Sequence, residues 1–209
     1  MNLEKRIGEK ILGNNSNKVH LNQLAIILGT NCNLKCPHCL GGNPNKMQIE
    51  EEYIDALTDC ISGIDELSFF GYETTLYIDK IHMVFEKLIN ANIKINRFSI
   101  FTNAVSFSEK LVDLIKLYQG YVKKPERVML HFSDDSFHYN DRFTQEECFN
   151  NIQKYIDVFG DSCQYSIQKF DKDTHLVIQG RAKELSSKQT AAIPKIMIPI
   201  NNKNYFKNR

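Results

Sequence analysis

Along residues 21–180, short apolar runs alternate with segments in which apolar residues recur every three to four positions. The apolar runs predict four strands, at 24–28, 66–70, 97–101 and 127–132. The periodic segments predict four helices, at 47–61, 76–91, 108–120 and 144–160. The run LAIIL at 24–28 is continuous, which is typical of a strand buried on both faces. This alternation favours a mostly parallel sheet with helical crossovers.

Two of the predicted helices carry end signals. Ser108 stands where a capping hydroxyl is expected for the helix that runs to Gly120. Thr144 and Glu147 form a capping-box pair at the start of the last helix, and Gly160 is a natural stop at its end. These residues predict the helix boundaries more sharply than the apolar period does.

The pattern changes after residue 160. Two further apolar runs, 163–170 and 175–179, are separated by only four residues, which is too short for a helical crossover and predicts a hairpin. A closed eight-stranded barrel needs about 250 residues, so this chain predicts an α/β fold of another kind: a partial, open (β/α)6-like TIM barrel of mostly parallel strands, trimmed at its C-terminal end. We divide the chain into an N-terminal extension (1–20), a core domain (21–185) and a basic tail (186–209).

Composition narrows the class of protein. The 209 residues are 42% hydrophobic and contain no run of about 18 apolar residues, so no membrane helix is expected. The first residues mix charges and lack an apolar signal segment, which favours the cytoplasm. Residues 181–209 carry net charge +6 and the rest −5, but no aromatic residues alternate with the basic ones, so nucleic-acid binding is not expected.

The six cysteines do not suggest disulfides, because the expected compartment is reducing and a chain of this length needs no cross-links. Cys60, Cys148 and Cys163 stand in apolar surroundings and are interpreted as buried structural thiols. The other three cysteines directly follow the first predicted strand. Ligands of parallel α/β sheets bind at the carboxyl ends of strands, so this is where chemistry is expected.

The spacing Cys32-x3-Cys36-x2-Cys39 has three interpretations. Cys36 and Cys39 could form an exchange dithiol, but Cys32 would have no role, and the cis-proline expected beside such a site has no good candidate, since Pro125 suits a surface turn. Structural zinc would need a fourth ligand, for example His38 or Cys60. An iron–sulfur cluster needs only the three thiolates, if one iron is left open for another ligand.

The stretch CNLKCPHCLGG resembles the signature of the radical SAM superfamily, in particular the core domain of its peptide- and cofactor-modifying members. The resemblance implies that Cys32, Cys36 and Cys39 bind one [4Fe–4S] cluster whose open iron binds S-adenosylmethionine (SAM). In this family one electron splits SAM, and the resulting 5′-deoxyadenosyl radical abstracts a hydrogen atom from the substrate. His38 takes the place of the usual aromatic residue near the cluster and adenine, although a plain loop role is equally open.

The end of the second strand can be compared with the glycine-rich GGEP-type segment of the family, whose backbone receives the SAM amino group. Here it holds Gly71, Tyr72, Glu73 and Thr74, of which only Gly71 and Glu73 match. Gly71 permits a tight turn and close backbone approach, and Glu73 is expected to accept a hydrogen bond from the ammonium group. A plain turn between strand and helix is the alternative.

Later strand ends also resemble the family's order of motifs. The resemblance places polar cofactor contacts at Ser99, Thr102 and Asn103 around the third strand, and at Ser133 and Asp135 after the fourth. His138 follows in the same loop; the resemblance suggests a residue on the cofactor side, and a solvated loop residue is the alternative. Gly180 and Arg181, followed by Ala182, resemble a Gly-Arg-Ala segment that is frequent after the last strand in related enzymes, where it lies near the adenine of SAM.

The chain also departs from its relatives. No cysteine follows Cys163, so one cluster and no auxiliary-cluster domain are expected. A trimmed barrel would be open on one side, where a peptide, protein or small-molecule substrate could dock or a homodimer could close it. The resemblance implies an electron donor such as flavodoxin or ferredoxin. No interaction with a membrane is expected. The alternative function is an iron–sulfur or SAM-binding module that has lost turnover, because the Gly71–Thr74 segment is degenerate; a CPHC oxidoreductase is a further alternative.

Overall fold

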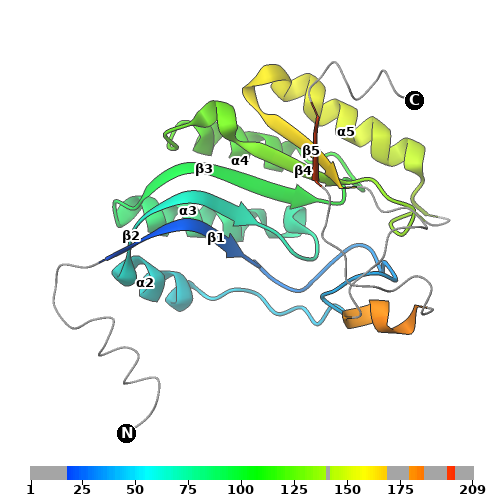
Figure 1. Ribbon diagram of the computed structural model, residues 1–209, viewed down its shortest axis with the longest axis horizontal. Helices are drawn as coiled ribbons and strands as arrows, with labels where there is room; N and C mark the ends of the chain where they lie inside the picture. Colours follow the sequence, from blue (N-terminus) through cyan, green and yellow to red (C-terminus); the bar gives the residue numbers. More distant parts are fainter. Residues whose placement is uncertain (1–17, 140–141, 169–178, 186–196, 201–209) are drawn as a thin grey trace, which may run out of the picture.

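The protein forms a single six-stranded sheet in the order β1-β2-β3-β4-β5-β6 (Figure 1). The computed structural model describes residues 18–139, 142–168, 179–185 and 197–200. The first five strands are parallel and β6 is antiparallel to β5. Their bounds are β1 Val19–Ile26, β2 Ile61–Phe69, β3 Lys94–Thr102, β4 Met129–Ser133, β5 Gln164–Gln168 and β6 Met197–Ile200. The predicted class, an open α/β sheet of mostly parallel strands, is confirmed.

Helices cross over between the parallel strands and cover one face of the sheet (Figure 1). They are α2 Glu51–Cys60, α3 Ile78–Asn90, α4 Glu109–Gln119 and α5 Gln145–Phe159. The apolar core lies between the two layers, where strand residues such as Phe98 and Phe132 contact Phe85 of α3 and Tyr155 of α5. Phe98 and Phe85 are fully buried. Because this layer excludes water, the opposite, concave face and the strand ends are left for binding.

The end signals of the helices are confirmed. Ser108 Oγ accepts a hydrogen bond from Leu111 N at 3.2 Å, and both capping-box bonds between Thr144 and Glu147 are formed. Gly160 ends α5 with φ +51°, a conformation that favours glycine. The two other helices begin later than their apolar period predicted, at Glu51 and Ile78.

Strand β1 differs from its prediction. The run at 24–28 was expected to be buried on both faces, but the strand is Val19–Ile26, and within the run only Ile26 and Leu28 are buried. Ala25 and Ile27 are exposed, Ile27 by 47%. The reason is position: among the described residues β1 pairs only with β2, so it forms the edge of the open sheet.

The C-terminal part of the sheet also differs from the expected hairpin. Its second strand, 175–179, lies outside the described residues except for Gln179. The antiparallel partner of β5 is β6, with Tyr165 opposite Ile200 and Gln168 opposite Met197. Residues 186–209, interpreted as a basic tail, therefore contribute a strand that their pattern did not predict.

The concave face of the sheet is polar in its middle. Glu66 Oε2 and Arg97 Nη2 form an ion pair at 2.5 Å, and Ser99 Oγ donates to Glu66 Oε1 at 3.2 Å. His131 stacks on Phe101 with ring centroids 4.0 Å apart. Burial, with a smaller effect of the nearby ion pair, lowers the pKa of His131 to about 4, so this imidazole is neutral at pH 7.

None of the helices in the described part of the chain is long and apolar enough to span a bilayer.

Candidate active site at the carboxyl edge of the sheet

The three motif cysteines lie on the loop that follows β1, which we call the cysteine loop (residues 31–42). Cys36 is buried, Cys32 and Cys39 are partly buried, and all three are free thiols. Cys39 N donates to Cys36 O at 3.2 Å, which closes a turn between these two. Burial is the main cause that raises the pKa of the Cys32 thiol to about 11, and the nearby Glu73, Cys36 and Cys39 add to it. The three thiols therefore share one electrostatic environment at the carboxyl edge, where β1–β5 end.

Arg181 braces this loop from the far end of the chain. Its Nε donates to Cys36 O at 2.9 Å, its backbone N donates to Cys39 O at 3.0 Å, and its Nη1 donates to Gly42 O. At Gly180, with φ +57°, a Cβ atom would lie 2.4 Å from Cys39 O. Only glycine fits so close to the loop. The contact of Gly180 and Arg181 with adenine stays a prediction; in this structure the pair holds the cysteine loop.

The turn after β2 is strained and packs against the same loop. Gly71 and Tyr72 have φ of +84° and +51°. The Tyr72 hydroxyl donates to Gly41 O, and a Cβ at Gly41 would lie 2.8 Å from the Tyr72 ring. Tyr72, which departs from the family pattern, thus closes over the glycines that end the cysteine motif.

Glu73 connects the ends of two strands. Its side chain is fully buried, and Oε1 accepts from Thr102 Oγ1 at 2.7 Å and from Thr75 Oγ1 at 2.7 Å. Thr75 N also donates to Oε1 at 3.1 Å, and Asn103 N donates to Oε2 at 2.9 Å. Three of these donors reach Oε1 and one reaches Oε2, so Oε2 keeps an acceptor site. The expected contact with a ligand ammonium group stays a prediction, and Thr74 is buried in the same turn.

The end of β3 reaches the cysteine loop through Asn103. Its Nδ2 donates to Asn33 Oδ1 at 2.8 Å and lies 3.9 Å from Cys32 Sγ. The following residue, Ala104, is buried with φ +52°, at the position where the family often has glycine. Thr102 and Asn103 are therefore brought to the site as predicted by their place after a strand. Ser99 is not, because it lies in mid-strand with its Oγ 2.8 Å from Ser68 Oγ.

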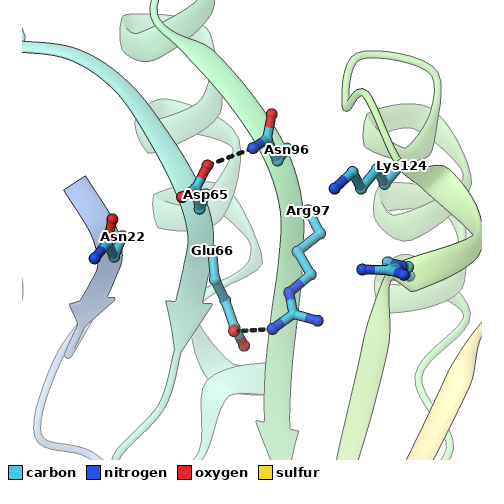
Figure 2. Close-up of a pocket in the computed structure, with 7 residues that line it drawn as sticks. Asn22, Asp65, Glu66, Asn96, Arg97 and Lys124 are labelled. Carbon is cyan, nitrogen blue, oxygen red and sulfur yellow. Dashed lines mark hydrogen bonds and ion pairs between the residues drawn. The ribbon is translucent and has the colours of Figure 1, made fainter. Parts of the chain in front are cut away.

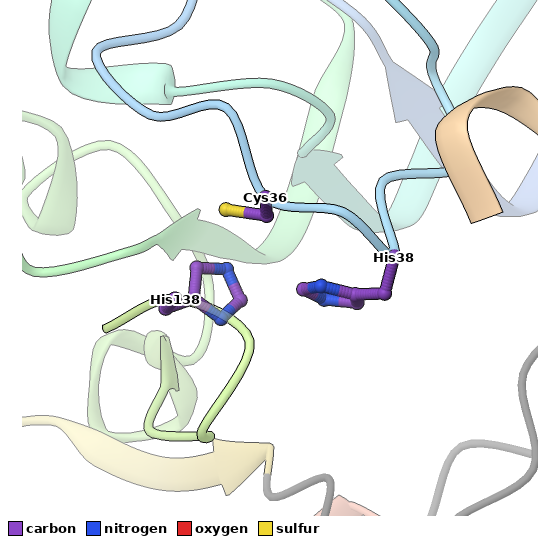
Figure 3. Close-up of side chains that lie close together, drawn as sticks. All are labelled: Cys36, His38 and His138. Atoms are coloured by element: carbon purple, nitrogen blue, oxygen red, sulfur yellow. The ribbon is translucent and has the colours of Figure 1, made fainter. Parts of the chain in front are cut away.

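The loop after β4 brings a charged pair to the cysteine loop. His138 Nδ1 and Asp135 Oδ2 are 2.7 Å apart, and both residues are buried. Burial lowers the pKa of His138, but the interactions with Asp135 and Cys36 outweigh it and raise the pKa to about 10. Cys36 Sγ and ring nitrogens of His38 and His138 lie within 4.8 Å of one another (Figure 3). Asp135 and Cys36 thus favour the protonated form of His138 beside the cysteine loop.

Several residues of the site were missed at the level of sequence. Phe137 lies against His38 with ring centroids 4.9 Å apart. The Tyr77 hydroxyl oxygen accepts a hydrogen bond from Asn31 N at 2.5 Å. In the sequence Tyr77 lies within the predicted helix 76–91, and no spacing distinguishes it from its neighbours. The role of Ser133, whose carbonyl oxygen is 3.5 Å from Cys148 Sγ, stays a prediction.

The geometry bears on the two alternative interpretations of the cysteines. For zinc it excludes Cys60 as the fourth ligand, but His38 stays open, because it lies within 4.8 Å of Cys36 and His138. Cys60 ends α2 directly before β2, at the amino end of the sheet, so a nine-residue strand of about 30 Å separates it from the cysteine loop. It cannot complete a zinc site with the three motif cysteines. The described residues contain no cis peptide, and Pro125 begins a 3-10 turn before β4, which does not support an exchange dithiol. Three free thiols on one braced loop fit a cluster that needs three thiolates.

Comparisons with known proteins agree with this arrangement. The family model of the radical SAM superfamily matches residues 26–143, which is more than half of the chain. Among the solved structures that match is native anSMEcpe with bound AdoMet and Cp18Cys peptide, with a TM-score of 0.50 and 18% sequence identity. The match covers 71% of this chain and 42% of that one, so this chain spans less than half of that protein's length. No curated protein matches.

Proposed function

Because the chain belongs to the radical SAM superfamily, we propose that it is an enzyme that binds one [4Fe–4S] cluster and SAM and abstracts a hydrogen atom from its substrate. When bound, the cluster would supply the electron that splits SAM into methionine and a 5′-deoxyadenosyl radical. The observation that carries the proposal is the cysteine loop. It presents three free thiols at the carboxyl edge of a parallel sheet, and Arg181 holds its backbone.

In this proposal Cys32, Cys36 and Cys39 are the cluster ligands, and each must lose its proton to bind iron. The raised pKa of Cys32 means that this thiol holds its proton until metal displaces it. His38, Tyr72 and the turn at Gly71 flank the loop, so they are the residues that would position SAM and exclude water. Glu73 and Asn103 would act indirectly, by fixing the turn and the loop to the end of β3.

The substrate we propose is a peptide or a protein. Among the described residues no strand pairs with the outer side of β1, and Ala25 and Ile27 are exposed there, which supports a large ligand at this edge. The protein anSMEcpe, similar in fold, carries a bound peptide. A small molecule is the alternative substrate, and a second copy of the chain is the alternative occupant of the open side. A flavodoxin or ferredoxin is the proposed electron donor.

A second function is favoured by one observation. Tyr72 stands in a left-handed conformation where the family has glycine, and its ring packs on Gly41. A chain with this turn could hold the cluster and SAM without turnover.

One anaerobic experiment separates the two functions. The protein is reconstituted with iron and sulfide and reduced with dithionite, and SAM is added. We expect about four iron atoms per chain, in line with a single cubane cluster, and accumulation of 5′-deoxyadenosine. Iron without 5′-deoxyadenosine would support the binding module, and absence of both would contradict the proposal.

Two cysteine variants provide the control. Cys32→Ala removes a proposed ligand, so we expect it to lose the iron and the 5′-deoxyadenosine together. Cys60→Ala removes a thiol that is equally free but lies at the other end of the sheet, and it should behave like the unmodified protein. Equal iron content in both variants would sink the ligand assignment.

A further inference from the structure

A second polar region lies on the concave face, toward the amino ends of the strands. It is a cavity of about 270 Å³, and Figure 2 shows its side chains in front of the sheet, with the helices behind. Every side chain that lines it is polar or charged. The lining residues are Asn22, Asp65, Glu66, Asn96, Arg97, Lys124 and Arg127. None of them belongs to the site at the carboxyl edge.

Both carboxylates of this cavity already have partners. Glu66 forms the ion pair with Arg97. Asp65 Oδ1 lies 3.0 Å from His20 Nε2 and also accepts from Asn96 Nδ2. The two carboxylates of β2 therefore interact with groups of strands β1 and β3, and they form no ion pair with the two basic residues on the opposite wall.

These basic residues are Lys124 and Arg127, which come from the segment before β4. Lys124 N donates to Asn96 O at 2.8 Å and Arg127 N donates to Lys124 O at 3.0 Å, so the backbone of this segment is fixed against β3. Lys124 extends over the sheet toward Arg97 (Figure 2). Among the described residues no carboxylate forms an ion pair with either side chain. This side of the cavity therefore carries two cationic side chains, Lys124 and Arg127, that no carboxylate among the described residues pairs with.

We propose that this cavity binds an oxyanion, a carboxylate or a phosphate group of a ligand. Three cations and two carboxylates line it, so the lining has net charge +1. The guanidinium of Arg97 has five N–H donors, and Glu66 engages it through Nη2, which leaves donors for a ligand. Charge-assisted hydrogen bonds to such groups are stronger than neutral ones. The amides of Asn22 and Asn96 add neutral donors to the same cavity.

The position of the cavity restricts the ligand. Arg97 lies five residues before Thr102, the last residue of β3, and a strand rises about 3.3 Å per residue, so the cavity lies about 16 Å from the carboxyl edge. The ligand could be the substrate of the enzyme, and this part of the inference rests on the proposed function. A substrate that reaches from the cavity to the carboxyl edge must be elongated. It would carry its anionic group at one end and the reacting hydrogen at the other.

The inference can be tested on the full-length, cluster-free chain. Inorganic phosphate and glutarate are titrated separately at constant ionic strength, so that general charge screening does not change. Binding is followed by NMR through the side-chain amides of Asn22 and Asn96. We expect saturable shifts of these signals for at least one of the two ions. Phosphate alone would identify a phosphate group, glutarate alone a carboxylate, and both a general oxyanion site.

Matched lysine variants decide whether the site is specific. Lys124→Ala removes a cation from the cavity, whereas Lys123→Ala removes an exposed neighbour that does not line it. Because one charge-assisted interaction is lost, we expect Lys124→Ala and Arg127→Ala each to weaken binding about fivefold. Lys123→Ala should leave it unchanged.

Two results would overturn the inference: no saturable shift with either ion, or equal weakening in Lys123→Ala and Lys124→Ala. The outcome does not depend on the radical chemistry, because no cluster or SAM is present in this measurement. Normal 5′-deoxyadenosine formation with no anion binding would reject the cavity alone. Anion binding without 5′-deoxyadenosine would reject the enzyme and keep the cavity.

Discussion

The helix-covered face of the sheet and its carboxyl edge are both buried, but they are stabilised by different interactions. On the helix-covered face apolar side chains such as Phe98 and Phe85 are fully buried and contact one another. At the carboxyl edge the buried groups are polar, and Glu73 and Asn103 connect the ends of neighbouring strands through hydrogen bonds. Apolar burial has no preferred direction, whereas hydrogen bonds do. Changes to the first region should therefore alter stability, and changes to the second should alter stability and site together.

The conformation of the backbone points to the same difference. Four described residues that are not glycine have positive φ. Tyr72 and Ala104 lie at the carboxyl edge, Lys46 lies in the loop before α2, and Asn92, a residue type that tolerates this conformation, lies in the turn before β3. Such a residue costs about 1–2 kcal/mol in conformational free energy. It persists because the surrounding hydrogen bonds hold it in place, as those of Glu73 do here. The edge is thus held in a conformation that its local sequence does not favour.

The largest expected effect is in the core. Phe98→Ala removes a fully buried ring between the sheet and α3, so we expect a loss of about 3–5 kcal/mol in the free energy of unfolding. Urea denaturation of the cluster-free chain measures this. The iron content of the protein that remains folded should not change, and the milder Phe98→Leu provides a second, more stable test. A core variant that folds but does not bind iron would break the comparison.

Glu73→Ala is expected to lower the free energy of unfolding by about 3 kcal/mol, because it leaves several buried donors without an acceptor. In contrast to the core variants, it should also reduce the iron bound per folded chain. Glu73→Gln keeps the shape and one acceptor oxygen, so its losses should be smaller in both measurements. Normal iron content in Glu73→Ala would show that the edge does not position the cysteine loop.

The concave face offers a test by pH. The pKa of His131 is about 4 in the folded chain and about 6.5 when unfolded, so the unfolded state takes up the proton first as the pH falls. This contribution to stability is present above pH 6.5 and is lost between pH 6.5 and 4. Between pH 7 and pH 5 we expect His131 to account for a loss of about 2 kcal/mol.

Urea denaturation of the chain and of His131→Gln at both pH values isolates this contribution, since the variant does not titrate there. Between pH 7 and pH 5 the free energy of unfolding of the unmodified chain should fall by about 2 kcal/mol more than that of His131→Gln. Parallel pH dependence of both proteins would mean that His131 is not held neutral by burial.

Much of the fold could be predicted from the sequence because its signals are local. The capping residues Ser108 and Thr144 act within one turn of the chain, and the apolar period of α5 is repeated over fifteen residues. Strand β6, with only four residues, has no period to detect. The exposure of β1 also could not be predicted, because the same apolar run suits a central strand and an edge strand; only pairing decides.

The place of the three motif cysteines could be predicted from the sequence, but the contacts that support their loop could not. Cys32, Cys36 and Cys39 stand together in the sequence, so their spacing alone suggests a common metal. The contact of Arg181 with Cys36 spans 145 residues, and no local pattern contains it. Glu73 was expected to contact a ligand, but its four donors come from its own turn and from the end of β3. Such long-range contacts depend on the packing of the whole sheet.

Arg181→Lys should have the smallest effect on the free energy of unfolding and still a large effect on iron binding. The side chain is only partly buried, so we expect a change of less than about 1 kcal/mol in the free energy of unfolding. A lysine has no planar fork of donors and cannot reproduce the bonds from Nε to Cys36 O and from Nη1 to Gly42 O. The cysteine loop would lose its brace, and iron bound after reconstitution should fall by about half or more, as expected when a supporting contact of a metal ligand is removed.

The control for Arg181→Lys is Lys183→Ala, an exposed cation on the same short helix that makes no described contact with the loop. It should leave both the stability and the iron content unchanged. If Arg181→Lys also binds full iron, the remaining contacts hold the shape of the cysteine loop, among them those of Tyr72 and Asn103 and the backbone bond from residue 181 to Cys39 O. If instead it loses iron with unchanged stability, the carboxyl edge contains a contact that serves the site and contributes almost nothing to folding. On the helix-covered face, fully buried apolar side chains such as Phe98 and Phe85 act through burial, so changes to them affect stability first.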